Sequence, residues 1–142
     1  MKTLMAPRLS RSGAFAVLNG ALGKAEQVGA SVSIAVVDDA AHLLAFARTD
    51  EAELYSIAIS MAKGRSSALT RFPSGKKSPS GNVRDDHHAL AITLAAGPGS
   101  FVTIPGGLPI FHKGKIVGAI GVSGAGHSDV EIAEAGVAAF SS

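Results

Sequence analysis

The sequence predicts an α+β domain, built from one mainly antiparallel sheet of five strands with helices packed against it. Two observations favour this class: stretches with helical spacing of apolar residues are interleaved with strand-like stretches, and the strand-like stretches come as consecutive hairpins. Hairpin strands pair antiparallel, which disfavours a doubly wound parallel sheet. The chain has 142 residues, 46% of them hydrophobic, so residues 1–142 are expected to form one domain with its own core.

Helices are indicated where apolar residues recur three and four positions apart and a helix-ending residue follows. The first such pattern stops at Gly29, which suits the position just after a helix, and the second stops before Pro73. Within the second pattern, Leu54, Met61 and Leu69 are expected to face inward. The helices are expected over residues 10–28, 52–69, 85–95 and 128–139.

Strands are indicated by alternating or continuous runs of β-branched residues between turn residues. They are expected over residues 31–37, 43–48, 101–104, 108–113 and 115–123. The helix after the last strand is expected to open with a capping box, in which the Ser128 hydroxyl accepts from an amide three residues on and Glu131 reaches back.

Composition and charge exclude several classes of function. The chain has no cysteine, which rules out disulfides, zinc–thiolate sites and thiolate nucleophiles. Its net charge of +2 is too small for a general nucleic-acid footprint, and no apolar leader or 18-residue apolar run is present. We therefore expect a cytoplasmic protein with neither nucleic acid nor membrane as a partner. The surplus of apolar residues over what a small monomer needs indicates self-association through a buried interface.

Two glycine-rich segments are the most site-like feature of the chain. The first segment is Gly106 and Gly107, which are expected to form a turn before a predicted strand. The second segment is residues 118–125, further along the chain. Such a turn can present unpaired amides to an anion, or it can be a plain connection in which glycine supplies a positive φ angle. Ser123 lies in the second segment, where the spacing departs from a nucleophile elbow, so a hydrogen-bond donor or a packing residue is favoured over a hydrolase nucleophile.

Residues 63–84 carry six basic residues and no acidic one, and regular structure is ruled out in the middle of this stretch. Prolines and glycines interrupt it, so we expect either a solvated loop or a lid over a small acidic ligand. Aromatic interleaving is missing, which disfavours nucleic-acid recognition. We expect a ligand site between the turn at Gly106 and this basic helix and loop, with charge supplied by Lys63 or Arg65.

His87 and His88 are adjacent on a predicted helix, so their side chains point about 100° apart and cannot chelate one metal together. His88 has Arg84 and Asp85 one turn before it, which are the more site-like surroundings. A general base or a single axial ligand is one interpretation of these histidines, and an ordinary surface or packing role is the other. No spacing typical of metal ligands is present, so no dedicated metal centre is predicted.

Several segments together resemble a known family. The resemblance lies in Gly106–Ile110, in Val117–Ala125 with the Asp-containing helix after it, and upstream in Val36–Asp38, Arg48–Ala52 and Ala62–Lys63. This set is similar to the GlcG/HbpS family, the haem-binding domain also found at the C-terminal end of PduO-type proteins. The resemblance implies a profilin-like layout, haem as a ligand, and self-association into dimers or larger assemblies such as octamers. It also places Asp50, Glu53 and Lys63 in a polar cluster.

The hypothesis that follows from this resemblance is a protein that binds a small anionic or planar ligand. For haem, we would expect the propionates to meet Arg65, Arg71 or Arg84 and the iron to meet His87 or His88.

Two other hypotheses stay open. One is a metal-independent enzyme of the isomerase or lyase type, in which Lys63 or His88 transfers a proton on a small carboxylated or phenolic metabolite held against Gly106, Gly107 and Ser123. The other is a structural or regulatory oligomer without a ligand.

Overall fold

The computed structural model describes residues 1–141 and confirms the α+β class. In that part of the chain, four strands form one sheet in the order β2-β1-β4-β3, and every neighbouring pair is antiparallel. The strands are β1 (Ser33–Asp38), β2 (Leu43–Arg48), β3 (Gly107–His112) and β4 (Lys115–Ser123). The helices are α1 (Arg11–Val28), α2 (Ser56–Thr70), α3 (Asp86–Ala96) and α4 (Ser128–Ser141). None of these helices is long and apolar enough to cross a membrane.

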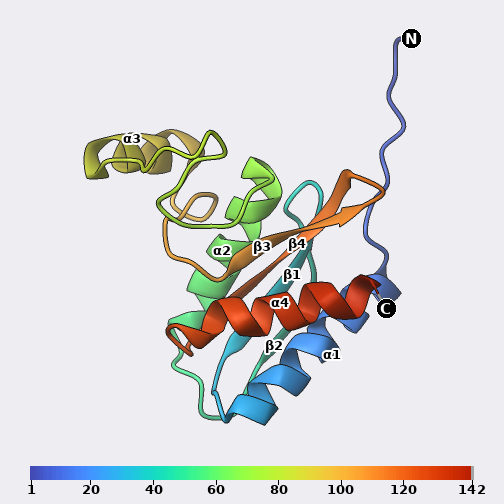
Figure 1. Ribbon diagram of the computed structural model, residues 1–142, viewed down its shortest axis with the longest axis vertical. Coiled ribbons are helices and arrows are strands. Elements are labelled where there is room, and N and C mark those ends of the chain that lie inside the picture. The colour runs from blue at the N-terminus through green and yellow to red at the C-terminus, as the bar shows by residue number, and fades with distance from the viewer. Residues whose placement is uncertain (142) are drawn as a thin grey trace.

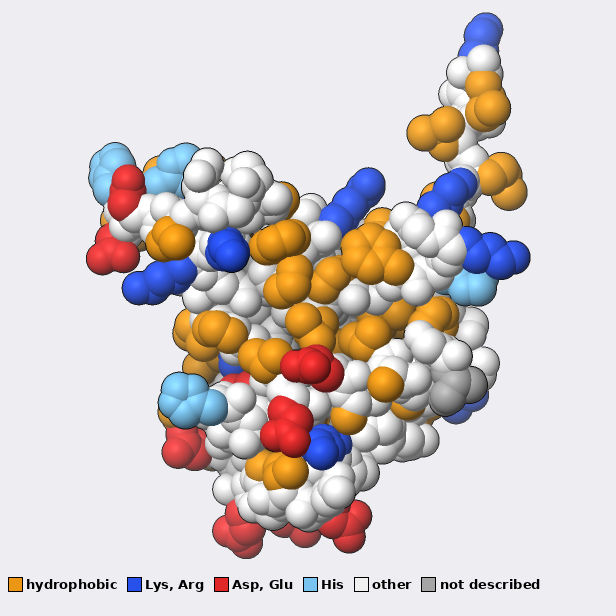
Figure 2. All heavy atoms as spheres, viewed as in Figure 1, with side chains coloured by type: hydrophobic (Ala, Val, Ile, Leu, Met, Phe, Trp, Pro, Cys, Tyr) orange, Lys and Arg blue, Asp and Glu red, His pale blue; other side chains and the backbone are white. Residues whose placement is uncertain are grey.

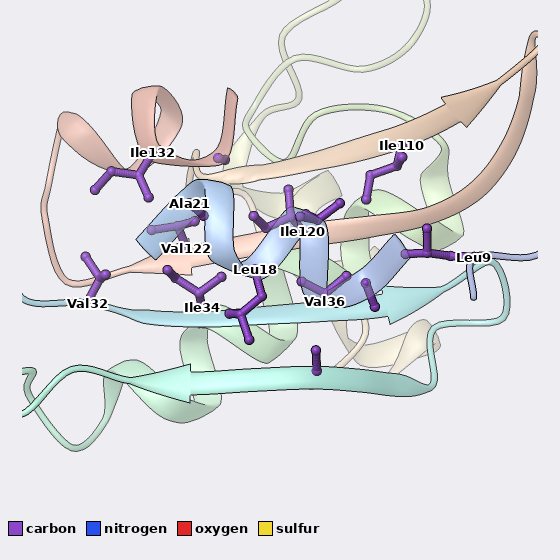
Figure 3. Close-up of a cluster of buried hydrophobic side chains, with 14 of the residues drawn as sticks. Leu9, Leu18, Ala21, Val32, Ile34, Val36, Ile110, Ile120, Val122 and Ile132 are labelled. Atoms are coloured by element: carbon purple, nitrogen blue, oxygen red, sulfur yellow. The ribbon is translucent and has the colours of Figure 1, made fainter. Parts of the chain in front are cut away.

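The sheet is the middle of three layers, with α1 and α4 on one face and α2 on the other (Figure 1). The large aliphatic side chains of β1 and β4 point toward α1 and α4, and Figure 3 shows Leu18 of α1 packed over Ile34 and Ile120 in this cluster. Side chains alternate along a strand, so the residues between these aliphatic ones point to the opposite face. Most of them are small. All six residues of β1 are buried as a result, since helices cover it from both sides.

Helix α2 packs on the sheet through its small and polar residues, which contradicts the predicted orientation. Leu54, just before the helix, and Leu69 are 69% and 51% exposed, whereas Ser60 and Gly64 are buried against the sheet. The reason is the strand face below: a Cβ at Gly121 would collide with the Ser60 carbonyl oxygen, so the helix backbone lies almost directly on the strand. Leucine side chains would not fit between them.

The fifth predicted strand, residues 101–104, is not a strand, and the prediction of five strands is wrong in this respect. The Val102 amide donates to the Ser66 hydroxyl of α2 (3.3 Å) instead of to a neighbouring strand, and Phe101 is buried. The segment is held against α2 by side-chain contacts, so its β-branched composition does not lead to strand pairing.

The outer edge of β3 is closed to further strands. The Gly107 amide donates to the Ser74 hydroxyl (2.8 Å), and its carbonyl accepts from the Ser74 amide (3.0 Å). Backbone direction alternates along a strand, so Pro109 also faces outward, and proline has no amide hydrogen to offer. The edge is therefore covered at Gly107, and the next outward-facing residue, Pro109, lacks a donor.

Helix α3 stands apart from the three layers, as Figure 1 shows, and no residue in it is buried. Its apolar residues Leu90 and Leu94 are 57% and 73% exposed, and Val83 before the helix is 71% exposed. Hydrophobic side chains also gather across the face that Figure 2 shows between α3 and α4. Exposed apolar surface of this kind is typical of an interaction face.

Candidate functional site

Lys63 is the centre of the candidate site. It extends from the middle of α2 to the C-terminal end of β4 and is only 1% exposed. Its ammonium group donates to the Val122 carbonyl oxygen (2.7 Å) and to Asp129 Oδ2 (3.0 Å). A buried lysine needs such partners, because an unpaired ammonium group in the protein interior is strongly disfavoured.

Asp129, in the first turn of α4, is the partner that sequence reasoning missed. Its Oδ2 accepts from Lys63, and its Oδ1 accepts from the Ala125 amide (2.8 Å), so both carboxylate oxygens are engaged. Helix α4 begins at Ser128 itself, one residue earlier than the predicted capping box requires. The only signal for Asp129 was its place inside that capping motif, 66 residues from Lys63.

The two glycines of the predicted anion-binding turn both make room for Lys63. A Cβ at Gly106 would lie 2.9 Å from the Lys63 Nζ. The φ angle there is +129°, which residues other than glycine rarely adopt. A Cβ at Gly107 would overlap the Lys63 carbonyl oxygen and lie 2.7 Å from Ser67 Oγ. The Gly107 amide is already bonded to Ser74, so this turn positions α2 and its ammonium group.

An open pocket of about 280 Å³ lies over the ion pair, and we call it the Lys63 pocket. It brings together three of the residues that the sequence analysis singled out, Glu53, Lys63 and Ser123. Asp129 completes the charged part of the wall, and Ile59 and Ile104 form part of the apolar wall. The N-terminal ends of α2 and α4 meet at this pocket, since residues on either side of both helix starts line it.

The mouth of the pocket carries Glu53 and Tyr55, both exposed. The Glu53 carboxylate accepts a hydrogen bond from the Tyr55 hydroxyl and lies beside it, which raises the pKa of that phenol. Just inside the mouth, the Ser56 hydroxyl is bonded to the Ser33 hydroxyl (2.8 Å). Asp50 is exposed and does not line the pocket, and its side chain has no hydrogen-bond or ion-pair partner among residues 1–141.

Arg65 is used within the chain. Its guanidinium group donates to the carbonyl oxygens of Gly99 (3.0 Å) and Ala41 (3.1 Å) and to the Ser100 hydroxyl (3.3 Å). It therefore ties the turn between β1 and β2 to the segment after α3, and most of its donors are taken.

A second hollow, of about 420 Å³, holds Arg84 and His88 at the start of α3, and we call it the His88 hollow. The Arg84 guanidinium lies over the Phe101 ring, 5.1 Å from its centre, and donates to the Lys77 carbonyl oxygen (3.2 Å). His87 is exposed on the same helix but does not line the hollow. The adjacent histidines thus differ in their surroundings.

No group of three or more His, Cys, Asp or Glu side chains in residues 1–141 lies close enough to hold a metal ion. The fold and the Lys63 pocket together describe a small α+β protein with a charged cavity at one end of a four-stranded sheet. The chain belongs to the HbpS-like family, because the family model described as "Haem degrading protein HbpS-like" matches residues 9–138. The predicted resemblance to the GlcG/HbpS family is confirmed.

Individual relatives agree with this assignment. Protein GlcG of Escherichia coli (strain K12) is 35% identical over 121 residues, which cover 81% of each chain. A double mutant of Streptomyces reticuli HbpS is similar at a TM-score of 0.77 and 28% identity, covering 96% of this chain and 90% of that one. The structure described as a PduOC:Heme complex has a TM-score of 0.73 and 21% identity, over 93% and 94% of the two chains, and shows the shared fold.

Proposed function

We propose that this protein binds a small ligand in the Lys63 pocket. The observation that carries the proposal is a buried ammonium group at the wall of an open cavity, with two acceptors for its three N–H groups. A buried ion pair by itself adds little net stability, since both charges lose their hydration. Its position at a pocket wall is what a binding site requires, and pockets with a few convergent polar groups are where ligands bind.

The proposal is tested by thermal-shift screening of small metabolites against the wild-type protein and two serine variants. Ser123→Ala removes a hydroxyl from the Lys63 pocket, whereas Ser80→Ala removes one from the His88 hollow. A ligand of the Lys63 pocket is expected to lose stabilising power with the first variant and keep it with the second. Ligands that respond only to Ser80→Ala would place binding in the His88 hollow and contradict the proposal.

Haem is a second candidate ligand, supported by the family description as a haem-degrading protein. The residues of the His88 hollow fit such a group: an imidazole could meet the iron, the Arg84 guanidinium could meet a propionate, and Val83 and Ile92 offer apolar contact. Bound there, haem would supply redox chemistry, while the chain would orient it and limit its exposure to water.

The two adjacent histidines provide a matched test of haem binding. Haemin added to the wild-type protein is expected to give a shifted Soret band at about one haem per chain. His88→Ala is expected to abolish the shift, and His87→Ala is expected to leave it unchanged, since His87 does not line the hollow. Equal effects of both variants, or no Soret shift with the wild type, would count against this site.

Self-association is the third part of the proposal. An 11-residue helix without a single buried residue is marginal on its own, because most helical stability comes from packing an apolar face. A second copy of the chain packed on Leu90 and Leu94 would bury that face. Light scattering at micromolar concentration is expected to give a mass above the 14.3 kDa of one chain.

A further inference from the structure

We propose that the Lys63 pocket selects a small uncharged carbonyl compound, whose oxygen accepts hydrogen bonds from Lys63 Nζ and Ser123 Oγ. This inference rests on the proposed ligand-binding function and adds the chemical class of the ligand. Three features of the pocket carry it: its unused donors, the balance of charge around them, and its size.

Two donors in the pocket wall are left without an acceptor. The Lys63 ammonium has three N–H groups, and the structure gives it two acceptors, Val122 and Asp129. Ser123 is 6% exposed and lines the pocket, and among residues 1–141 its hydroxyl has no hydrogen-bond partner. Both donors border an open pocket, so a ligand oxygen placed there could accept a hydrogen bond from each of them.

The charges around these donors disfavour an anion. Lys63 is already neutralised by Asp129 at 3.0 Å, and Glu53 at the mouth adds a second carboxylate to the same wall. A ligand carboxylate would therefore meet two negative side chains and one positive one. Its attraction to the pocket would not offset the cost of removing its own charge from water. A carbonyl oxygen accepts the same hydrogen bonds without that cost.

The helix ends at the pocket do not offset this imbalance. A helix N-terminus binds anions through its free amides, but here local turns already use several of them. The Ser56 amide donates to the Glu53 carbonyl oxygen (3.0 Å), and the Ser128 and Asp129 amides donate to carbonyl oxygens of the preceding turn (3.2 and 3.1 Å). Among the buried side chains of the pocket wall, the donors that remain are Lys63 and Ser123.

The size of the pocket limits the ligand. A water molecule occupies about 30 Å³ of liquid, so a pocket of about 280 Å³ has room for roughly nine groups of that size. The walls formed by Ile59 and Ile104 suit an apolar body, with the polar oxygen directed at Lys63. A small amide, ketone, aldehyde or ester with a short apolar group has this shape.

Three probes of similar size separate the alternatives: benzamide, benzoate and benzylamine. They are titrated into the protein labelled with ¹⁵N, and the amide signals of Gly124 and Gly126, which line the pocket, report binding there. Benzamide is expected to shift these signals with at least tenfold higher affinity than benzoate or benzylamine. Tighter binding of benzoate or benzylamine would overturn the carbonyl assignment and leave the ligand pocket in place.

Variants identify the donor. Ser123→Ala is expected to weaken benzamide about fivefold, the effect of one hydrogen bond, and Ser80→Ala is expected to change nothing. Unchanged benzamide affinity in Ser123→Ala would overturn the role of the Ser123 hydroxyl. If none of the three probes shifts the Gly124 and Gly126 signals, the proposed ligand pocket fails together with this inference.

Discussion

Replacing Lys63 with methionine should destabilise the protein strongly while leaving the hydrophobic stem of the side chain in place. The Lys63 side chain is 1% exposed and the side chain of its partner Asp129 is 7% exposed, so the substitution leaves a buried charge without a counter-ion. Removing one member of a buried pair typically costs about 3–5 kcal/mol. The Val122 carbonyl oxygen also loses its donor, which places Lys63→Met in the upper part of that range.

A surface ion pair in the same molecule provides the control. Lys24 lies 3.1 Å from Glu131 between α1 and α4, and the two side chains are 26% and 53% exposed. Lys24→Met is therefore expected to cost less than about 1 kcal/mol, since solvent screens an exposed pair. Both variants make the same chemical change, and they differ in burial.

Urea unfolding followed by circular dichroism measures both effects, and a thermal melt gives a second readout. For a chain of this length, a loss of about 3–5 kcal/mol corresponds to a melting temperature lower by roughly 10–15 °C. Adding Asp129→Asn to Lys63→Met removes the orphaned charge and keeps an acceptor for the Ala125 amide. The double variant is expected to be more stable than Lys63→Met alone by about 2 kcal/mol.

Two results would refute this reasoning. A Lys63→Met protein within about 1 kcal/mol of the wild type would mean that the carboxylate of Asp129 has access to water or another partner. A double variant less stable than Lys63→Met would mean that the lost stability does not come from an unpaired charge on Asp129.

Three further predictions follow from other parts of the structure. Gly107→Val should unfold the protein or lower its melting temperature by more than 10 °C, because any Cβ there overlaps the α2 backbone. As the control, Gly23→Ala should melt at or above the wild-type temperature, because a Cβ at that position meets nothing within 4 Å. Leu94→Asp should leave the circular dichroism spectrum unchanged but lower the mass in light scattering, and an unchanged mass would exclude α3 from the interface. Glu53→Gln should lower the pKa of Tyr55, because a neutral neighbour no longer disfavours the phenolate. The chain has one tyrosine, so an ultraviolet titration measures this pKa directly. An unchanged pKa would show that the two groups do not interact in solution.

The helices and the strands of the two hairpins could be predicted from the sequence because their patterns are local. Gly29 ends α1 with a φ angle of +69°, as its place after the apolar pattern predicted. Residues 101–104 have the same local character as a strand, yet what decides their structure is remote: the Ser66 hydroxyl accepts the Val102 amide, and Ser74 occupies the edge of β3. A pattern of side chains does not contain that information.

The orientation of α2 was mispredicted for a similar reason. Periodicity places leucines inside, but the sheet face beneath α2 carries mostly small residues, among them Gly121, and Ser60 and Gly64 of the helix lie directly against it. The candidate site was partly predictable: the family resemblance marked Lys63, while Asp129 was hidden in a helix-start motif. The pairing of two residues so far apart in the chain depends on the tertiary fold.

The closed edge of β3 has a consequence for how copies of this protein can assemble. Sheets grow from chain to chain when both outer strands offer free backbone groups, and growth then continues without limit. Here Ser74 and Pro109 block one side, so strand addition could occur only at β2. Two copies joined through β2 would each present a blocked outer edge, and the combined sheet would end there. Extended fibres built by strand pairing are thus disfavoured, and an assembly larger than two such copies would need contacts of another kind.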